Sequence, residues 1–149
     1  MAGVVVVAAA GNTGFQYGAG APGLANPAYN RYIIAVGGYD TMGTADTTDD
    51  VIGAYSASTN CVTCKLPDVL AVGSHLQGLR VPNGYLDLTH PEGRVGSRYF
   101  RGSGTSQAAA IASGSVALLL QKYPKLTPDQ VKTWLMRSSS LLYAKTITG

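Results

Sequence analysis

The stretch Gly-Val-Val-Val-Val-Ala-Ala-Ala-Gly at residues 3–11 is short, apolar throughout and rich in β-branched side chains. Such a run predicts a central parallel strand with both faces buried. Asn12 follows it directly, so we expect its side chain near the carboxyl edge of the sheet, where open α/β sheets place their functional sites. A loop rich in Gly, Ala and Pro continues to Asn30.

Three further apolar segments predict strands. Residues 32–38 (Tyr-Ile-Ile-Ala-Val-Gly-Gly) predict a second buried strand, and residues 51–58 predict a half-buried one. Residues 66–73 predict a fourth strand, with Pro67 at its entry. The segment 73–102 is irregular, rich in Gly and Pro, and expected to contain a hairpin.

The character of the chain changes after Gly104. Residues 108–120 are small and apolar almost all round, which predicts a helix buried in the domain centre that ends before Pro124. Thr127-Pro-Asp-Gln130 has the pattern of a helix start and predicts an amphipathic surface helix. The order of elements favours an α/β fold with a mostly parallel sheet. Too few helices separate the strands for a complete doubly wound sheet, so residues 1–149 are interpreted as one domain that is part of a larger fold.

The composition narrows the function classes. The chain has 149 residues, 46% of them hydrophobic and 13% charged, which indicates a globular domain with a sizeable core. Its net charge is +3 and its basic residues are scattered, which argues against nucleic-acid binding. No apolar run approaches the roughly 20 residues that a membrane span needs, and we read no signal peptide at its start.

Cys61 and Cys64 lie in a polar loop as Cys-Val-Thr-Cys. A disulfide closing a short loop is the favoured interpretation, and two free thiols are the alternative. A zinc site would need two more ligands, and a redox pair is expected at a helix start, so both are less favoured. A disulfide would indicate an oxidising compartment and a secreted protein.

Two residues are candidates for chemistry. Ser106 lies between a glycine-rich loop and the apolar helix, where a hydroxyl can project into a cleft and the helix N-terminus favours negative charge. The amide of Asn12 can donate a hydrogen bond to a developing oxyanion. Taken alone, each has a simpler explanation: a helix N-cap for Ser106, and a turn asparagine in left-handed conformation for Asn12.

Two other motif interpretations fail on spacing and order. Residues 11–14 (Gly-Asn-Thr-Gly) lack the glycine spacing of a dinucleotide-binding loop, and no apolar helix follows them. The elbow serine of an α/β-hydrolase is followed in the chain by its acid and then its histidine, whereas no histidine follows Ser106.

Taken together, residues 4–12 (Val-Val-Val-Val-Ala-Ala-Ala-Gly-Asn) and 104–110 (Gly-Thr-Ser-Gln-Ala-Ala-Ala) are more specific than either segment alone. The sequence resembles the subtilisin-like (subtilase) serine proteases: the first segment is similar to the strand before the oxyanion asparagine, and the second to the nucleophile signature. Segments 32–38, 66–73 and 124–132 resemble the intervening strands and the closing helix, in the same order. The resemblance covers residues 3–139 and implies a partial three-layer subtilisin-like fold with a buried central helix.

The resemblance also implies roles. Ser106 would attack the scissile carbonyl, and Asn12 and the Ser106 N–H would donate to the oxyanion. The floor of the primary specificity pocket would be residues 8–11, which are Ala8, Ala9, Ala10 and Gly11, with the loop 14–26 as another wall. Gly104 and Thr105 would lie beside a protein or peptide substrate bound in extended form. No cofactor is implied. The family often binds structural calcium, to which Asp68 and carbonyls of the loop 25–30 could contribute, although an oxygen site needs six or more ligands.

The sequence departs from the family pattern in two respects. The family's catalytic Asp and His precede its Asn, but only a strand precedes Asn12 here. We therefore expect His75 and His90 to be surface or loop residues, and we assign no catalytic role to any aspartate, namely Asp40, Asp46, Asp49, Asp50, Asp68, Asp87 and Asp129. Ala110 stands where the family commonly has Pro.

These departures leave two hypotheses. The first is that residues 1–149 are the C-terminal portion of a peptidase catalytic domain whose N-terminal half, with the Asp and His, is a missing partner. The alternative is a non-catalytic remnant or peptide-binding module. Coding sequence upstream of Met1 separates them, because Asp-Thr-Gly-like and His-Gly-Thr-like segments in frame favour the enzyme.

Overall fold

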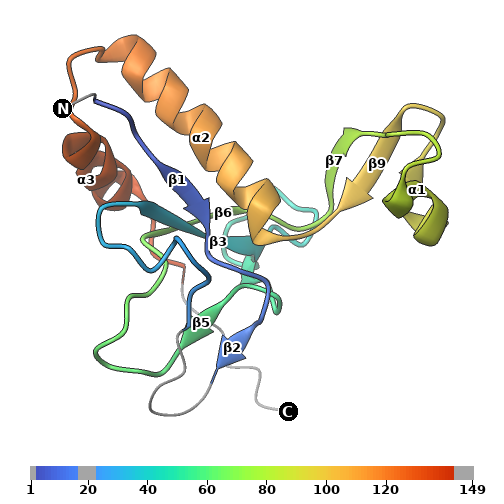
Figure 1. The fold of residues 1–149 in the computed structure, drawn as a ribbon, viewed down its shortest axis with the longest axis horizontal. Coiled ribbons are helices and arrows are strands. Elements are labelled where there is room, and N and C mark those ends of the chain that lie inside the picture. Colours follow the sequence, from blue (N-terminus) through green and yellow to red (C-terminus); the bar gives the residue numbers. More distant parts are fainter. Residues whose placement is uncertain (1–2, 17–22, 143–149) are drawn as a thin grey trace.

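The computed structural model describes residues 3–16 and 23–142. The main sheet is built around β3 (Ile34–Asp40), which pairs in parallel with β1 (Val7–Ala9) and with β6 (Val69–Val72). The short β4 (Val51–Ile52) pairs antiparallel with the end of β3. Figure 1 shows β3 at the centre of this sheet, with the long helix α2 (Thr105–Lys122) lying across it. The mostly parallel sheet of the α/β prediction is therefore present.

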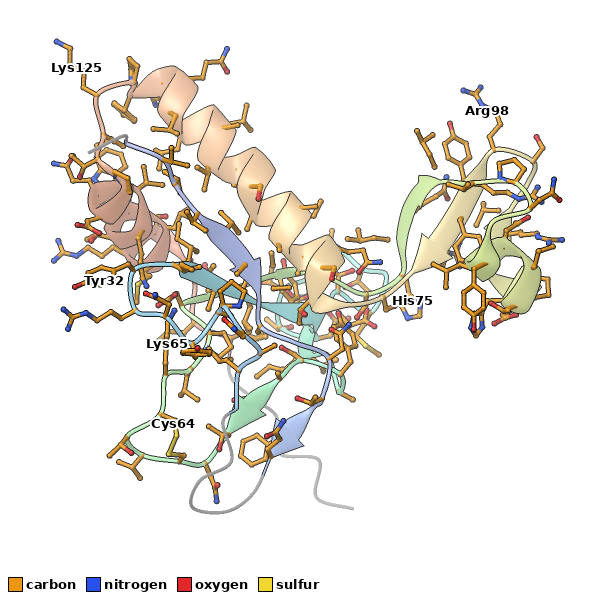
Figure 2. The ribbon with its side chains drawn as sticks, in the orientation of Figure 1. Tyr32, Cys64, Lys65, His75, Arg98 and Lys125 are labelled. Atoms are coloured by element: carbon orange, nitrogen blue, oxygen red, sulfur yellow. A yellow bond between two sulfur atoms is a disulfide. The ribbon has the colours of Figure 1, made fainter. Side chains whose placement is uncertain are left out.

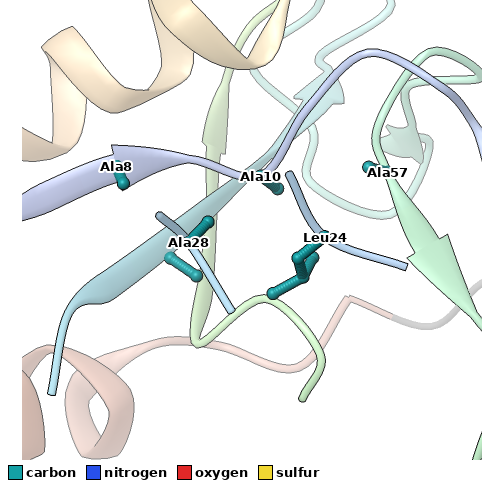
Figure 3. Close-up of a cluster of buried hydrophobic side chains, with 6 residues drawn as sticks. Ala8, Ala10, Leu24, Ala28 and Ala57 are labelled. Carbon is teal, nitrogen blue, oxygen red and sulfur yellow. The ribbon is translucent and has the colours of Figure 1, made fainter. Parts of the chain in front are cut away.

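The two faces of the sheet are covered differently because side chains alternate along its strands. On one face, a cluster combines residues of β3, α2 and α3 (Pro128–Ser138), namely Ile34, Val36, Ala108, Ala112, Val116 and Val131. On the other face, small side chains gather around Leu24 in a cluster completed by Ala8, Ala10, Ala28, Ala35 and Ala57 (Figure 3). Alanines at these positions let the segment after residue 23 approach the sheet backbone closely.

The start of α3 and the end of α2 follow the local sequence signals. Thr127 caps α3: its Oγ1 accepts a hydrogen bond from the Gln130 N–H, and the Gln130 side chain accepts one from the Thr127 N–H. Val131 is buried while Trp134 is 44% exposed, so α3 is the amphipathic surface helix that the sequence predicts. The helix α2 ends at Lys122, before Pro124.

Cys61 and Cys64 form a disulfide, which confirms the favoured interpretation of this pair. The bridge lies in the loop after β5 (Ser58–Thr59), which pairs in parallel with β2 (Phe15–Gln16). The prediction of a single strand over residues 51–58 was wrong. Residues 51–58 are not one strand, because a turn in which the Ser56 N–H bonds to the Gly53 carbonyl separates β4 from β5.

Residues 76–102 form an arm that projects from the body beside the start of α2 (Figure 1). Its antiparallel sheet has the order β7 (Leu76–Leu79), β9 (Tyr99–Gly102), β8 (Arg94–Val95). The predicted hairpin is therefore present. The connection also contains α1 (Tyr85–Thr89) and the 3₁₀ helix η1 (Pro91–Gly93), which the sequence analysis did not anticipate.

A buried carboxylate holds the arm together. Asp87 is 3% exposed, accepts two hydrogen bonds from Arg80 (2.6 and 2.9 Å) and one from Arg94 Nε (2.8 Å), and also accepts the Asn83 N–H. The Arg80 hydrogen bonds hold the pKa of Asp87 well below its usual range, with Asn83 and Arg94 acting in the same direction and burial opposing them. Paired charges thus take the place of an apolar core in this small unit.

Two predictions of burial differ from the structure. The first valine run is not buried on both faces: Val4 is 65% and Val6 46% exposed, because the segment after residue 23 covers that face only at Ala8 and Ala10. Within the described residues, only one face of the helix α2 is covered. On its other face, Ile111 is 46% and Leu118 68% exposed. No helix in the described ranges is both long and apolar enough to cross a bilayer.

The pairing of Asp87 predicts acid sensitivity of the arm. Because the pKa of this carboxyl is lowered in the folded state, its contribution to stability is complete above the unfolded-state pKa of about 4 and is lost as the pH falls further. We expect Asp87→Asn to lower the thermal midpoint at pH 6 and to flatten its decline between pH 4 and 2. Asp49→Asn, which changes a half-buried carboxylate that accepts the Thr44 hydroxyl and no arginine, is the control. A wild-type midpoint that stays constant down to pH 2 would contradict this assignment.

Candidate active site

The end of β1 and the start of α2 meet through a buried threonine. The Thr105 hydroxyl accepts a hydrogen bond from the Gly11 N–H (3.1 Å) and donates one to Asn12 Oδ1 (2.9 Å). The Thr105 N–H donates to the same Oδ1 (2.9 Å). Thr105 is 1% exposed, so its end of the network is shielded from water, whereas Asn12 is an exposed residue. It joins two segments that lie more than 90 positions apart in the sequence.

This network fixes the orientation of the Asn12 carboxamide. A backbone N–H only donates, so the Asn12 atom that the Thr105 N–H contacts must be the carbonyl oxygen. The amide nitrogen Nδ2 therefore lies on the other side of the group, and no acceptor within the described residues takes a hydrogen bond from it. A donor is thus held in place next to the chain segment that carries Ser106.

The simpler explanations for the two candidates do not hold. The residue capping α2 is Gly104, without a side-chain cap, so Ser106 lies in the first helical turn and is not the N-cap. Asn12 is not among the non-glycine residues with positive φ, so it is not a left-handed turn residue. Ser106 is exposed, and its hydroxyl makes no hydrogen bond with any described residue. The open first turn of a helix favours negative charge near this hydroxyl.

Gly104 packs closely against Gln107 and Asn12. A Cβ at residue 104 would lie 2.9 Å from Gln107 Oε1 and 3.1 Å from Asn12 Nδ2. The Gly104 N–H also donates to the Gly73 carbonyl (2.8 Å), which ties the loop before α2 to the end of β6. A side chain at residue 104 would therefore press on the Gln107 side chain and on the Asn12 carboxamide.

The segment 8–11, expected as a pocket floor, is anchored on both sides. The side chains of Ala8 and Ala10 are buried, and Ala9 is half-buried. The Ala10 carbonyl accepts the Ala25 N–H (2.8 Å), and the Gly11 carbonyl accepts the Ala57 N–H (2.9 Å). Gly11 has φ +111°, and a Cβ there would lie 3.0 Å from Ala25 Cβ. Of the expected wall at residues 14–26, residues 17–22 lie outside the described part.

Thr105 is the residue whose role the sequence analysis missed. From the sequence we expected Thr105 beside the substrate. In the structure its side chain is buried and positions Asn12. A threonine between a glycine and a helix shows no local sign of this role. The signal exists only when the glycine–asparagine pair after β1 is known to face it.

Both histidines are exposed, as expected. His75 is 71% exposed, with Nε2 lying 3.4 Å from Asp40 Oδ2, and Figure 2 shows it at the base of the arm. His90 is 58% exposed, with Nδ1 lying 3.0 Å from Glu92 Oε1. Neither histidine bonds to the Ser106 hydroxyl. The described residues therefore bring together a hydroxyl and an amide donor, but place no general base beside them.

The residues expected at a calcium site do not fit a metal ion. Asp68 Oδ2 lies 3.0 Å from Lys65 Nζ, and Asp68 Oδ1 lies 2.9 Å from Lys132 Nζ. Burial lowers the pKa of the Lys65 ammonium, and its hydrogen bond to Asp68 opposes that shift. The described ranges hold no cluster of three His, Cys, Asp or Glu side chains suited to a metal. Both oxygens of the carboxylate that calcium would need thus form ion pairs with lysine ammonium groups.

The site combines an exposed serine in the first turn of a helix with an asparagine amide fixed beside that turn, above a parallel sheet. This combination is the one that the resemblance to the subtilases implied. The Subtilase family model matches residues 1–148, and the chain belongs to this family. The resemblance stated from the sequence is confirmed.

Individual relatives agree with the family assignment. The chain is 43% identical over 135 residues to the serine protease AprX of Bacillus subtilis (strain 168), covering 90% of this chain and 30% of AprX. Among solved structures, the prenylagaramide maturation protease PagA is 30% identical with a TM-score of 0.62, covering 93% of this chain and 41% of PagA. Fervidolysin from Fervidobacterium pennivorans, a keratinolytic enzyme related to subtilisin, is 25% identical with a TM-score of 0.68, covering 94% and 19%.

These alignments confirm the subtilisin-like α/β fold and a serine-protease family. They also show that the chain spans less than half the length of each of these three relatives.

The Thr105 network predicts a specific stability difference. Thr105→Val keeps the shape but leaves the Gly11 N–H without its acceptor and removes one donor to Asn12, so we expect the free energy of unfolding to fall by about 1–3 kcal/mol. Thr105→Ser keeps the hydroxyl and loses a methyl group, at a cost of about 1 kcal/mol. Urea denaturation of the purified protein measures both. A valine variant as stable as wild type would show that the network does not hold the two segments together.

Proposed function

We propose that this chain carries the nucleophile and the oxyanion-binding residues of a serine endopeptidase. Ser106 Oγ attacks the scissile carbonyl carbon, and the carbonyl oxygen becomes an oxyanion that accepts hydrogen bonds from Asn12 Nδ2 and the Ser106 N–H. The observation that supports this assignment best is the pair of Thr105 bonds to Asn12 Oδ1, which leaves Nδ2 available next to the serine turn.

The value of this arrangement is that the donor is oriented before the reaction. A free carboxamide would have to rotate and shed water as charge develops on the substrate oxygen. Asn12 is already fixed through its oxygen by a buried residue, so its N–H group meets the developing charge with little reorganisation. The first turn of α2 adds its own favourable field for a negative charge.

The hydroxyl needs a base that the described residues do not place beside it. An unassisted serine hydroxyl is a weak nucleophile. The order of catalytic residues in the subtilase family puts the Asp and the His before the oxyanion asparagine. We propose that these two groups come from an N-terminal half of the catalytic domain, and that this chain alone retains only the residual catalysis of binding and oxyanion stabilisation, on the order of 10³–10⁴ over water.

The substrate proposed for this site is an extended peptide that lies across residues 8–11 and the loop before α2. Gly102 carries no side chain that could block an approaching backbone, and binding through backbone pairing tolerates many side chains. We propose a secreted location, which the Cys61–Cys64 disulfide supports because such bonds persist in oxidising compartments.

Covalent labelling tests the nucleophile. In the complete protein, a phosphonate serine-protease probe should label wild type and lose all labelling in Ser106→Ala. Ser103→Ala is the matched control, because it removes a nearby hydroxyl that accepts the His75 N–H and should leave labelling intact. Unchanged labelling of Ser106→Ala would defeat the assignment. A complete protein that is not labelled at all would favour the non-catalytic peptide-binding alternative.

Two substitutions separate the donor role of Asn12 from its structural role. Asn12→Ala should raise the activation free energy by roughly 3 kcal/mol, about a hundredfold in kcat, a magnitude borrowed from another enzyme of the subtilisin family. Asn12→Asp can still accept both Thr105 bonds but has no N–H to donate, so it should keep the stability and lose at least as much activity. Steady-state kinetics with unfolding curves measure both effects. An Asp variant with wild-type kcat would rule out the donor role.

A further inference from the structure

The ammonium group of Lys65 lies inside a cage of oxygen atoms. Its Nζ donates to the carbonyls of Ala28 (2.8 Å), Asn30 (2.9 Å) and Ile33 (2.9 Å), and it lies 3.0 Å from Asp68 Oδ2. The Lys65 side chain is only 17% exposed. In Figure 2 Lys65 lies among the crowded side chains of the body, in contrast to Lys125, which extends into solvent. Four oxygens around one nitrogen exceed the three protons that an ammonium can donate.

The cage is formed by a turn-rich stretch of backbone. Within it the Ala28 N–H bonds to the Ala25 carbonyl, the Asn30 N–H to the Pro27 carbonyl, and the Ile33 N–H to the Asn30 carbonyl. These turns leave several carbonyls directed to one side of the segment. Carbonyl dipoles that converge in this way repel each other unless a positive charge lies between them.

A second lysine contacts the same segment and shares the Ile33 carbonyl and the Asp68 carboxylate with Lys65. Lys132 on α3 donates to the carbonyls of Arg31 (2.8 Å) and Ile33 (3.0 Å), and its Nζ lies 2.9 Å from Asp68 Oδ1. The Ala35 N–H also donates to Asp68 Oδ2 (2.8 Å), which fixes the carboxylate against β3. The arrangement has the chemistry of a cation-binding site, namely backbone carbonyls with a single carboxylate.

We propose that this cage is a cation site in which the Lys65 ammonium is the cation, so that the segment 24–33 is held in place without a metal ion. The oxygen-to-nitrogen distances of 2.8–3.0 Å suit an ammonium and are longer than the roughly 2.3–2.6 Å of calcium–oxygen bonds. The ammonium stands where a metal ion would, and it cannot dissociate from the protein.

The held segment bears on the candidate active site. The Ala25 N–H within it donates to the Ala10 carbonyl. The Ala25 Cβ packs against Gly11, the residue immediately before Asn12. Lys65 is therefore a positioning residue for the backbone that precedes the amide donor. It fixes that backbone from the face of the sheet opposite to α2.

Replacing Lys65 should convert the cage into a metal-dependent one. In the purified protein, Lys65→Ala should lower the thermal midpoint by roughly 5 °C in choline chloride, because three carbonyls and a carboxylate each lose one charged hydrogen-bond donor. At equal ionic strength, Na⁺, K⁺ or Ca²⁺ should then restore at least half of that loss in a saturable way, beyond any change it causes in wild type. Lys65→Met fills the space with an apolar chain, so it should lose stability without being restored. Lys125→Ala is the control for an exposed lysine.

Isothermal titration gives an independent readout, in which Lys65→Ala should bind one more ion than wild type. Because Lys132 could move into the vacated space, Lys65→Ala/Lys132→Ala is titrated as well. The proposal is overturned if Lys65→Ala is as stable as wild type, or if neither variant gains an ion site. It is also overturned if wild type binds an ion that Asp68→Asn abolishes. None of these readouts depends on peptidase activity.

Discussion

Two hydrogen bonds from Thr105 to a single oxygen of Asn12 join the end of the first strand to the start of the central helix. They come from a buried residue, they fix which end of the carboxamide is exposed, and they bring Asn12 next to the turn that contains Ser106. The remaining features of the chain matter for function because they hold these two segments at a fixed separation. Without the bonds, the serine and the amide would be two exposed polar groups with no defined relation.

The sheet supplies that separation through small residues on both of its faces. On one face, alanines of α2 pack on Ile34 and Val36, and this contact sets the height of the helix above β3. On the other, Ala8, Ala10 and Gly11 let the segment after residue 23 approach closely, and Lys65 holds the carbonyls of that segment. The backbone before Asn12 is therefore clamped between α2 and a lysine-filled oxygen cage.

Features with a local cause could be predicted from the sequence. Thr127, Pro128 and Gln130 specify the start of α3 through contacts within four residues, and the helix and strand segments around Ser106 and Asn12 carry a family signature. The position of Asn12 directly after a strand of the parallel sheet was therefore predictable. So was the hairpin between residues 73 and 102.

Features that depend on distant partners could not be predicted. The exposure of Val6 and Leu118 follows from which neighbours cover them, and periodicity carries no information about that. The break between β4 and β5 arises from a turn at Gly53, inside a run that looks continuous in the sequence. Nothing in the sequence near Lys65 distinguishes it from a surface lysine, because the carbonyls that surround it come from more than 30 positions away.

The most direct test of the central claim is a crystal structure of the complete protein with a peptide boronic acid bound to its nucleophilic serine. The account predicts a tetrahedral adduct on Ser106 Oγ with one boronate oxygen about 2.7–3.1 Å from both Asn12 Nδ2 and the Ser106 N–H. Asn12 Oδ1 should remain bonded to Thr105. An adduct on another residue, or a carboxamide turned away from the boronate oxygen, would contradict the account.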